Sequence, residues 1–351
     1  MNDFDQYLRQ GEAAEPGKRA AAWQTAIGLQ DVDGLRPSEY LVQTARRNIE
    51  GDITIGEAKE LIDTYYRSRE ARQEVETERT EEADKVSARI AELLQEDTFS
   101  FAPAELSRIH RRLFEGIFKR AGEYRTYNIS KKEWVLDGAS VLYNPFENIA
   151  ETLDYDFSQE RGFDYNAVAA DAAIAHLGTF IAGIWQIHPF GEGNTRTTAV
   201  FLIEYLRRLG FRVGNDLFAS HSWYFRNALV RANYVDRGKG IRPTQEFLGQ
   251  FLRNLVLGEK NELHNRRLHV SQAVEDAPKS KNCTLDCTLE EAALLKFLRE
   301  SPTATQKQMA GHLRCSERTV KTMTVRLQQA GLLARENGRR SGKWVVKLQG
   351  K

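Results

Sequence analysis

The sequence is poor in cysteine and proline and has no long apolar run. Of its 351 residues, 3 are cysteine and 8 are proline. The longest apolar stretch, near Ala172–Ile187, contains His176 and Gln186 and is shorter than the roughly 20 residues that a membrane-spanning helix needs. The N-terminus is polar and acidic, unlike a secretory signal. We therefore expect a cytoplasmic protein with no membrane partner and with its cysteines as reduced thiols, namely Cys283, Cys287 and Cys315.

What is present is the composition of a folded protein with more than one domain. Hydrophobic residues make up 41% of the chain and charged residues 28%, which excludes disorder. At about 150 residues per domain, the length allows two or three domains. The spacing of apolar residues predicts a helical region over residues 1–95 and a helical domain over 96–263. A polar segment, 264–285, predicts a linker before a last domain over 286–351.

The C-terminal domain carries most of the positive charge. The whole chain has a net charge of +1, whereas Thr288–Lys351 has 13 lysines and arginines against 5 acidic residues. Helices expected over 289–300, 305–313 and 316–329, followed by two strands around Asn337-Gly338, are typical of a winged helix-turn-helix. The residues expected to face a partner are Arg318, Thr319, Lys321, Thr322, Arg339, Arg340 and Lys343. They predict DNA as a partner, with contact to a protein as the alternative.

A turn signal precedes the central helices. Between Asn128 and Tyr143, apolar residues flank Asp137-Gly138, a pair typical of a two-residue hairpin turn. We therefore expect a two-stranded hairpin beside the helices. Its exposed edge would be able to pair with an extended segment of another protein.

Nine residues between two expected helices, His188–Arg196 (HPFGEGNTR), concentrate the chemistry of the chain. A helix near 166–187 must stop before Pro189, because the residue before a proline avoids the helical conformation. The loop glycines let backbone N–H groups approach a ligand, and the start of the next helix adds unpaired N–H donors. An anion site is therefore expected at Gly193, Asn194 and Thr195.

The charged side chains of this loop suit a phosphate bound together with a metal ion. Arg196 stands in the first turn of its helix, where a cation opposes the helix dipole, so we expect it to bind phosphate. Glu192 would repel that phosphate unless a cation such as Mg²⁺ lay between them. His188 is the candidate general base, because histidine titrates near neutrality. The plain alternative is that these residues only close a tight turn. A zinc hydrolase is disfavoured, because Pro189 keeps His188 and Glu192 off one helix face.

The nine residues resemble the active-site signature of Fic-domain proteins, HPFx[DE]GN[GK]R. The similarity extends over about Leu106–Leu257 and puts the expected hairpin where the family has the flap that holds its target. The resemblance implies a mainly α fold, a Fic-type helical bundle with a β-hairpin flap, followed here by the small winged helix domain. It also implies transfer of AMP from ATP, with Mg²⁺, to a Ser, Thr or Tyr hydroxyl of a protein target.

The resemblance also assigns roles to residues. His188 would be the catalytic base and Glu192 the metal ligand. The implied nucleotide-binding residues are Gly191, Gly193, Asn194, Thr195 and Arg196, with Tyr224 and Asn227 at the adenine. Two positions depart from the family: Thr195 replaces the usual Gly or Lys, and Ala199 stands where many members have a second arginine for the outer phosphates. The donor nucleotide is therefore less well defined than the class of reaction.

A segment near the N-terminus resembles the inhibitory helix of the family, whose pattern is [ST]xxxE[GN]. Glu50 and Gly51 match it, while Arg46 stands at the Ser/Thr position. Because the second arginine is absent, Glu50 is expected to reach Arg196 and to compete with phosphate for it. The alternative is that Glu50-Gly51 only ends a helix.

The sequence as a whole favours a self-inhibited protein adenylyltransferase. One alternative is a nucleotide-sensing, DNA-binding regulator, which would need the phosphate site but no base. Another is a transferase of the same fold that uses a different nucleotide or a phosphocholine-type donor. The resemblance also leaves room for a homodimer.

Overall fold

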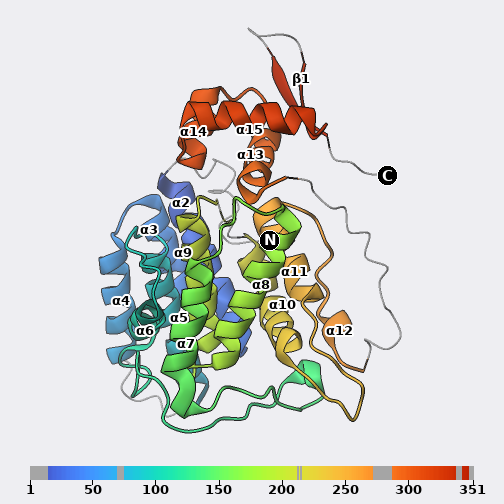
Figure 1. Ribbon diagram of the computed structural model, residues 1–351. Helices are drawn as coiled ribbons and strands as arrows, with labels where there is room; N and C mark the ends of the chain where they lie inside the picture. The colour runs from blue at the N-terminus through green and yellow to red at the C-terminus, as the bar shows by residue number, and fades with distance from the viewer. Residues whose placement is uncertain are drawn as a thin grey trace.

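The computed structural model describes residues 15–68, 75–211, 213, 216–271, 287–336 and 342–347. Helices dominate, and the two strands belong to the C-terminal end of the described chain (Figure 1). This confirms the predicted fold class, which is mainly α. No helix within the described ranges is both long and apolar enough to cross a membrane. Cys287 and Cys315 form no disulfide within the described residues, and Cys283 lies outside them.

The N-terminal helices pack against one side of the bundle. Their bounds are α2 (Glu15–Gly28), η1 (Leu29–Asp33), α3 (Glu39–Glu50), α4 (Ile55–Arg67) and α5 (Val75–Leu93). A capping box begins α4, because the Thr54 hydroxyl accepts from the Glu57 N–H while the Glu57 carboxylate accepts from the Thr54 N–H. The short η1 contacts α9 and α10, so residues 29–33 reach the interior of the bundle.

The central bundle surrounds one apolar helix. Its elements are α6 (Pro103–Phe114), η2 (Trp134–Leu136), η3 (Phe146–Asn148), α7 (Ile149–Arg161), α8 (Ala170–Ile187), α9 (Asn194–Arg208), α10 (Asp216–Asn233), α11 (Glu246–Leu252), the π-helical η4 (Arg253–Leu257) and α12 (Asn265–Leu268). The helix α8 contacts α7, α9, α10 and α11 (Figure 1). Leu177 and Ile181 are fully buried in it. A helix that is apolar on most faces is stable only in such a position, as its sequence predicted.

The predicted hairpin flap is not a regular hairpin. The chain turns at Asp137-Gly138, where both residues have a positive φ, as expected. Backbone pairing across the turn is limited to Glu133 with Ala139 and Gly138 and to Leu136 with Ala139, and residues 128–143 contain the 3-10 turn η2 and no strand. The reason is packing, because Val135 is buried against the bundle and a flat ladder would lift it out.

The C-terminal elements follow the predicted order. They are α13 (Leu289–Glu300), α14 (Gln306–Leu313), α15 (Glu317–Gln329), β1 (Leu333–Glu336) and β2 (Lys343–Val346), with antiparallel register from Leu333↔Val346 to Glu336↔Lys343. The connection between the strands, including Asn337-Gly338, Arg339 and Arg340, lies outside the described residues. These elements dock on the bundle, where the Ala170 N–H donates to the Cys287 carbonyl (2.7 Å).

The boundary of the bundle differs from the predicted linker over 264–285. Residues 265–268 form α12, and Leu268 is fully buried. The Val270 N–H donates to the Val135 carbonyl (2.9 Å), and Arg231 donates to the Leu268 carbonyl (2.6 Å). The apolar side chains of Leu268 and Val270 therefore hold the chain on the bundle as far as residue 270. The rest of the predicted linker, 272–285, lies outside the described residues.

Candidate active site

A sharp turn joins α8 to α9 and carries the nine-residue motif. His188 follows the last residue of α8 with a φ of 50°, an uncommon value for a residue other than glycine. Gly193 precedes α9 with a φ of 74°. A Cβ atom on Gly193 would lie 2.4 Å from Cε2 of Phe114, so this position requires glycine for space as well as for conformation. The turn thus places an imidazole and the start of a helix next to each other.

Two polar side chains of the motif hold the loop together. The Asn194 side chain accepts from the Phe190 N–H (3.0 Å) and donates to the Phe190 carbonyl (2.8 Å). The Thr195 hydroxyl accepts from the indole N–H of Trp185 (3.0 Å). No side chain caps α9, so the N–H groups of its first turn are left to bind an anion. Asn194 and Thr195 therefore offer phosphate their backbone N–H groups rather than their side chains.

Arg125 supports the same loop from outside the motif. Its Nε donates to the His188 carbonyl (2.8 Å) and one Nη donates to the Ile187 carbonyl (3.2 Å). The Arg125 N–H donates to the Pro189 carbonyl (2.8 Å). A guanidinium can hold several carbonyl groups at once, so Arg125 fixes the end of α8 in the conformation that orients His188.

His110 of α6 fastens the middle of the loop. Its Nδ1 accepts from the Gly122 N–H (2.8 Å), so the hydrogen is on Nε2, which donates to the Glu192 carbonyl (3.0 Å). Its ring stacks on Phe190 at a centroid distance of 3.8 Å. Burial lowers the pKa of His110 to about 4, so the ring is neutral at pH 7. No motif or periodic pattern around His110 indicated this role.

The geometry of His188 suits a general base. The ring is 3% exposed, and its Nδ1 lies 3.1 Å from the Trp185 carbonyl. A carbonyl can only accept, so Nδ1 carries the hydrogen and Nε2 keeps its lone pair. Burial, and secondarily the charge of Lys131, hold the pKa of His188 well below its ordinary value. The Tyr143 ring lies 4.3 Å from the imidazole, centroid to centroid.

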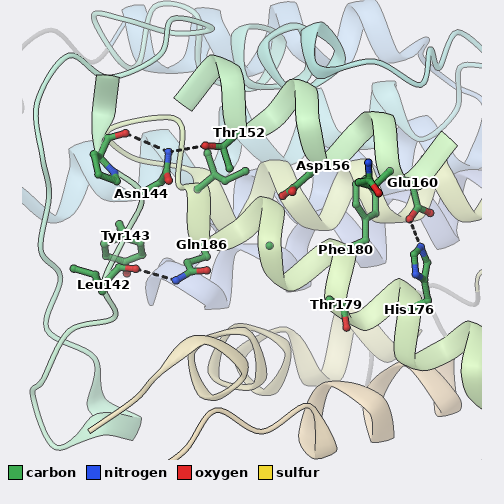
Figure 2. Close-up of a pocket in the computed structure, with 14 residues that line it drawn as sticks. Leu142, Tyr143, Asn144, Thr152, Asp156, Glu160, His176, Thr179, Phe180 and Gln186 are labelled. Atoms are coloured by element: carbon green, nitrogen blue, oxygen red, sulfur yellow. Dashed lines mark hydrogen bonds and ion pairs between the residues drawn. The ribbon is translucent and has the colours of Figure 1, made fainter. Parts of the chain in front are cut away.

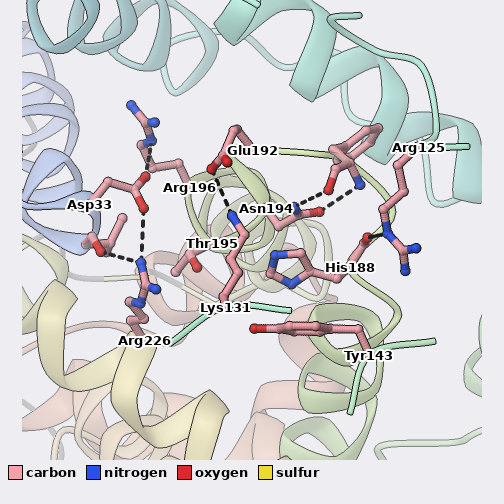
Figure 3. Close-up of polar contacts among 12 residues, drawn as sticks. Asp33, Arg125, Lys131, Tyr143, His188, Glu192, Asn194, Thr195, Arg196 and Arg226 are labelled. Atoms are coloured by element: carbon pink, nitrogen blue, oxygen red, sulfur yellow. Dashed lines mark hydrogen bonds and ion pairs between the residues drawn. The ribbon is translucent and has the colours of Figure 1, made fainter. Parts of the chain in front are cut away.

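The phosphate candidate Arg196 is buried among acceptors (Figure 3). It is 1% exposed. Its Nε is 2.9 Å from Oδ2 of Asp33, and one Nη is 2.5 Å from Oε1 of Glu82. The other Nη donates to Oε1 of Gln30 (3.0 Å). Gln30 and Glu82 thus accept from the two Nη groups, and Asp33 forms an ion pair with Nε without hydrogen-bond geometry. Groups from the N-terminal elements therefore surround the guanidinium that the motif would offer to a phosphate.

A second arginine, Arg226 of α10, reaches the same carboxylate. One of its Nη atoms donates to the other oxygen of Asp33, Oδ1 (3.1 Å), and to the Val32 carbonyl (2.8 Å). The other Nη lies 3.1 and 3.0 Å from the two carboxylate oxygens of Glu133. Sequence analysis did not identify Asp33, Glu82, Glu133 or Arg226. An acidic residue before a glycine, as in Asp33-Gly34, was the only available signal.

Glu192 is the carboxylate of the motif that suits a metal ion. Its side chain is 65% exposed, and its Oε2 lies 2.8 Å from Nζ of Lys131. The carboxylate therefore already faces a cation. Within the described ranges, no cluster of three or more His, Cys, Asp or Glu residues has metal-binding geometry. A single carboxylate completed by phosphate oxygens and water is a usual arrangement for Mg²⁺, so these residues fit that ion.

Residues 98–206 match the model of the Fic/DOC family. This part of the chain is a Fic domain. It begins before α6 and extends into α9, so it contains His188, Glu192 and Arg196.

Relatives of the whole chain are distant. One is the protein adenylyltransferase VbhT of Bartonella schoenbuchensis, 23% identical over 242 residues, which cover 64% of this chain and 48% of the relative. The chain thus spans about half the length of that curated relative. Solved structures that resemble it include the N-terminal Fic domain of Bep8 from Bartonella sp. 1-1C (16% identity, TM-score 0.42, covering 53% of this chain and 88% of the other). A Fic family protein from Desulfovibrio desulfuricans G20 is also similar (11% identity, TM-score 0.45, covering 99% and 94%).

Three predicted site residues lie away from the Fic motif. Glu50 is exposed at the end of α3, which packs on α2 and α4, and the carboxylates at Arg196 belong to Asp33 and Glu82. The expected contact between Glu50 and Arg196 is therefore corrected. The physical reason is the packing of the elements, because η1 packs on α9 while α3 packs on α2 and α4.

The two predicted adenine contacts are buried in the bundle. Tyr224 is 1% exposed, and its hydroxyl donates to the Phe247 carbonyl (3.3 Å). Asn227 is fully buried and donates to Oδ1 of Asn265 (2.8 Å). The face of α10 that carries them packs on α11 and α12, so the structure does not present either side chain to a nucleotide.

A cavity of about 490 Å³ borders the Fic motif (Figure 2). It lies between α7, α8 and residues 142–145, and Tyr143 faces both this cavity and His188. At its far end the Glu160 carboxylate accepts from Tyr165 (2.6 Å) and Tyr205 (2.5 Å) and lies 2.7 Å from Nε2 of His176. Since Glu160 is fully partnered, the polar end of the cavity is a packed network within the fold.

Proposed function

We propose that the Fic domain transfers AMP from ATP to a Ser, Thr or Tyr hydroxyl of a protein target. The observation that carries the proposal is the tautomer of His188: its Nδ1–H is committed to the Trp185 carbonyl, which leaves Nε2 free to accept a proton beside the uncapped start of α9. A protein that only senses a nucleotide would need the phosphate-binding site but no general base. The printed name of the relative VbhT, a protein adenylyltransferase, points the same way.

The reaction assigns one task to each part of the motif. Nε2 of His188 takes the proton of the target hydroxyl as its oxygen bonds to the α-phosphorus. The bond between that phosphorus and the bridging oxygen breaks, and pyrophosphate leaves with its electron pair. The N–H groups at Gly191, Gly193, Asn194 and Thr195, with the Arg196 guanidinium, hold the phosphates. Glu192 would hold Mg²⁺, which would supply positive charge at the departing phosphates.

We also propose that the chain is self-inhibited at the same site. Asp33 and Glu82 sit on Arg196, where a phosphate would have to bind. A carboxylate and a phosphate compete for the same guanidinium donors. We therefore assign the inhibitory role to Asp33, supported by Glu82, in place of Glu50. Movement of η1 and α5 away from α9 would free the arginine.

The proposal is tested by comparing nucleotide donors. The protein is incubated with Mg²⁺, a mixed protein extract and ATP labelled at the α-phosphate. Label is expected on proteins of the extract and on the chain itself. If label is transferred only from another nucleotide, or only from a phosphocholine donor, the chain is still a transferase but ATP is not its donor. Absence of label with every donor, in the Asp33→Ala variant as well, would reject the transferase.

We further propose that the C-terminal helices bind DNA. Arg318, Lys321 and Thr322 are exposed on α15, the third helix of the predicted winged helix-turn-helix, so their side chains are available to phosphates or bases. Binding to a duplex is expected to weaken steeply as salt rises from about 50 to 200 mM, because cations on DNA are released. Binding that does not change over this series would contradict phosphate contacts and favour a protein partner.

A further inference from the structure

The Fic motif lacks one of the cations that a triphosphate needs. Ala199, one turn after the N-terminal end of α9, is fully buried. No long cationic side chain therefore leaves the helix at this position. Arg196 alone provides one guanidinium for a triphosphate that carries three to four negative charges. A second cation, if the site has one, must come from another element.

The contacts of Asp33 indicate which element provides the second cation. Its carboxylate bridges two guanidinium groups, with Oδ2 at 2.9 Å from Nε of Arg196 and Oδ1 at 3.1 Å from Nη1 of Arg226 (Figure 3). An anion is thus already bound between two arginines from α9 and α10. Arg226 donates a hydrogen bond to Asp33, whereas Arg196 and Asp33 form an ion pair without hydrogen-bond geometry. The place that holds Asp33 is therefore positively charged on two sides, which also suits phosphate oxygens.

We propose that Arg226 is the second phosphate-binding arginine of this site. When Asp33 withdraws, Arg196 and Arg226 hold the outer phosphates of a nucleoside triphosphate between them. The inference rests on the proposed function, since it names the group that recognises the donor. It also explains how the chain tolerates Ala199 in its motif.

Glu133 keeps Arg226 in position for this task. Both Glu133 oxygens face one Nη of Arg226, and Glu133 is 2% exposed. The guanidinium also lies over the Trp223 ring, 5.6 Å from its centroid. These contacts do not involve Asp33, so they remain when Asp33 leaves. Arg226 then has one Nη paired with Glu133, and the other, which also donates to the Val32 carbonyl, faces the place that Asp33 vacated.

The test measures the affinity for ATP and for AMP in the presence of Mg²⁺. The full chain carrying Asp33→Ala is compared with Asp33→Ala/Arg226→Lys, because lysine keeps the charge next to Glu133 but loses the fork. We expect the Kd for ATP to rise about tenfold or more, and the Kd for AMP, which lacks the outer phosphates, to change less than about twofold. The Kd for inorganic pyrophosphate should rise in the same way as the Kd for ATP.

Arg231→Lys, in the same background, is the matched control. Arg231 lies on the same helix and is 4% exposed, but it donates to the Leu268 carbonyl. Arg231→Lys should leave the ratio of the Kd for ATP to the Kd for AMP unchanged. An equal weakening of ATP and AMP by Arg226→Lys, or no weakening, would overturn the inference. Partial unfolding lowers the number of sites and not this ratio, so an unstable variant still gives an answer.

The binding result is independent of the transfer assay. If the ATP affinity depends on Arg226 but no donor gives a labelled protein, the proposed function fails and the phosphate site stands. If label is transferred but Arg226→Lys leaves both affinities unchanged, the phosphate site fails and the function stands.

Discussion

Asp33→Ala is expected to raise AMP transfer and ATP affinity by about 5- to 150-fold, the usual range for coupling between a regulatory contact and a site. The substitution removes the carboxylate that bridges Arg196 and Arg226 and so releases Nε of Arg196 and one Nη of Arg226 from Asp33. The Glu82 contact with Arg196 remains, so Asp33→Ala/Glu82→Ala should exceed the single variant. Transfer is measured as α-phosphate label on protein, and affinity as the Kd for ATP with Mg²⁺.

Asp31→Ala and Glu50→Ala are the controls for this prediction. Asp31 is an exposed acidic residue of the same η1, and Glu50 is the exposed residue at the end of α3. Neither should change transfer or ATP affinity by more than about twofold. If Glu50→Ala activates transfer and Asp33→Ala does not, the inhibitory residue lies in α3, and the assignment of this role to Asp33 is contradicted.

His188→Ala is expected to reduce transfer by about 10²- to 10⁴-fold, the range for loss of a general base. The measurement is made in the Asp33→Ala background, where transfer is highest. ATP affinity should stay within about threefold, because His188 takes a proton and does not hold a phosphate. His264→Ala, on an exposed histidine, is the matched control and should leave transfer unchanged. Equal transfer with and without His188 would contradict its role as base.

The pH dependence follows from the lowered pKa of His188. The ordinary pKa of histidine is about 6.5, and burial keeps the folded value well below it, so Nε2 remains unprotonated at pH 6 as at pH 8. The rate of transfer should therefore not fall when the pH is lowered from 8 to 6.

The stability of the fold should depend on pH with the sign opposite to that of a paired histidine. Below about pH 6.5 these two histidines bind protons in the unfolded chain, whereas buried His188 and His110 stay neutral in the folded chain. The free energy of unfolding therefore falls as the pH is lowered.

The sequence predicted those features that depend on local chemistry. Pro189 ends α8, and the helix bounds of α13 follow from a capping box, in which Thr288 and Glu291 exchange hydrogen bonds. The turn between α8 and α9, with His188 at the end of α8, was predicted because its signals lie within nine residues. The predicted hairpin was wrong in its strands because burial of Val135 is a property of the whole bundle and not of the segment.

The contacts that the sequence could not predict join distant segments. An acidic residue before a glycine occurs at both Asp33-Gly34 and Glu50-Gly51, and only the packing of η1 on α9 distinguishes them. Arg125 and His110 hold the loop through backbone carbonyl groups, which leave no trace in residue type. Arg226 is one of many arginines in the chain, and its place beside Asp33 depends on how α10 packs against η1.

The most direct measurement follows the α- and γ-phosphates of ATP separately in the Asp33→Ala chain and in Asp33→Ala/His188→Ala. The account predicts α-label on protein with the first chain, its loss with the second while ATP is still bound, and no γ-label with either. Transfer of γ-label, or α-label that persists without His188, would show that the turn between α8 and α9 does not perform the chemistry assigned to it.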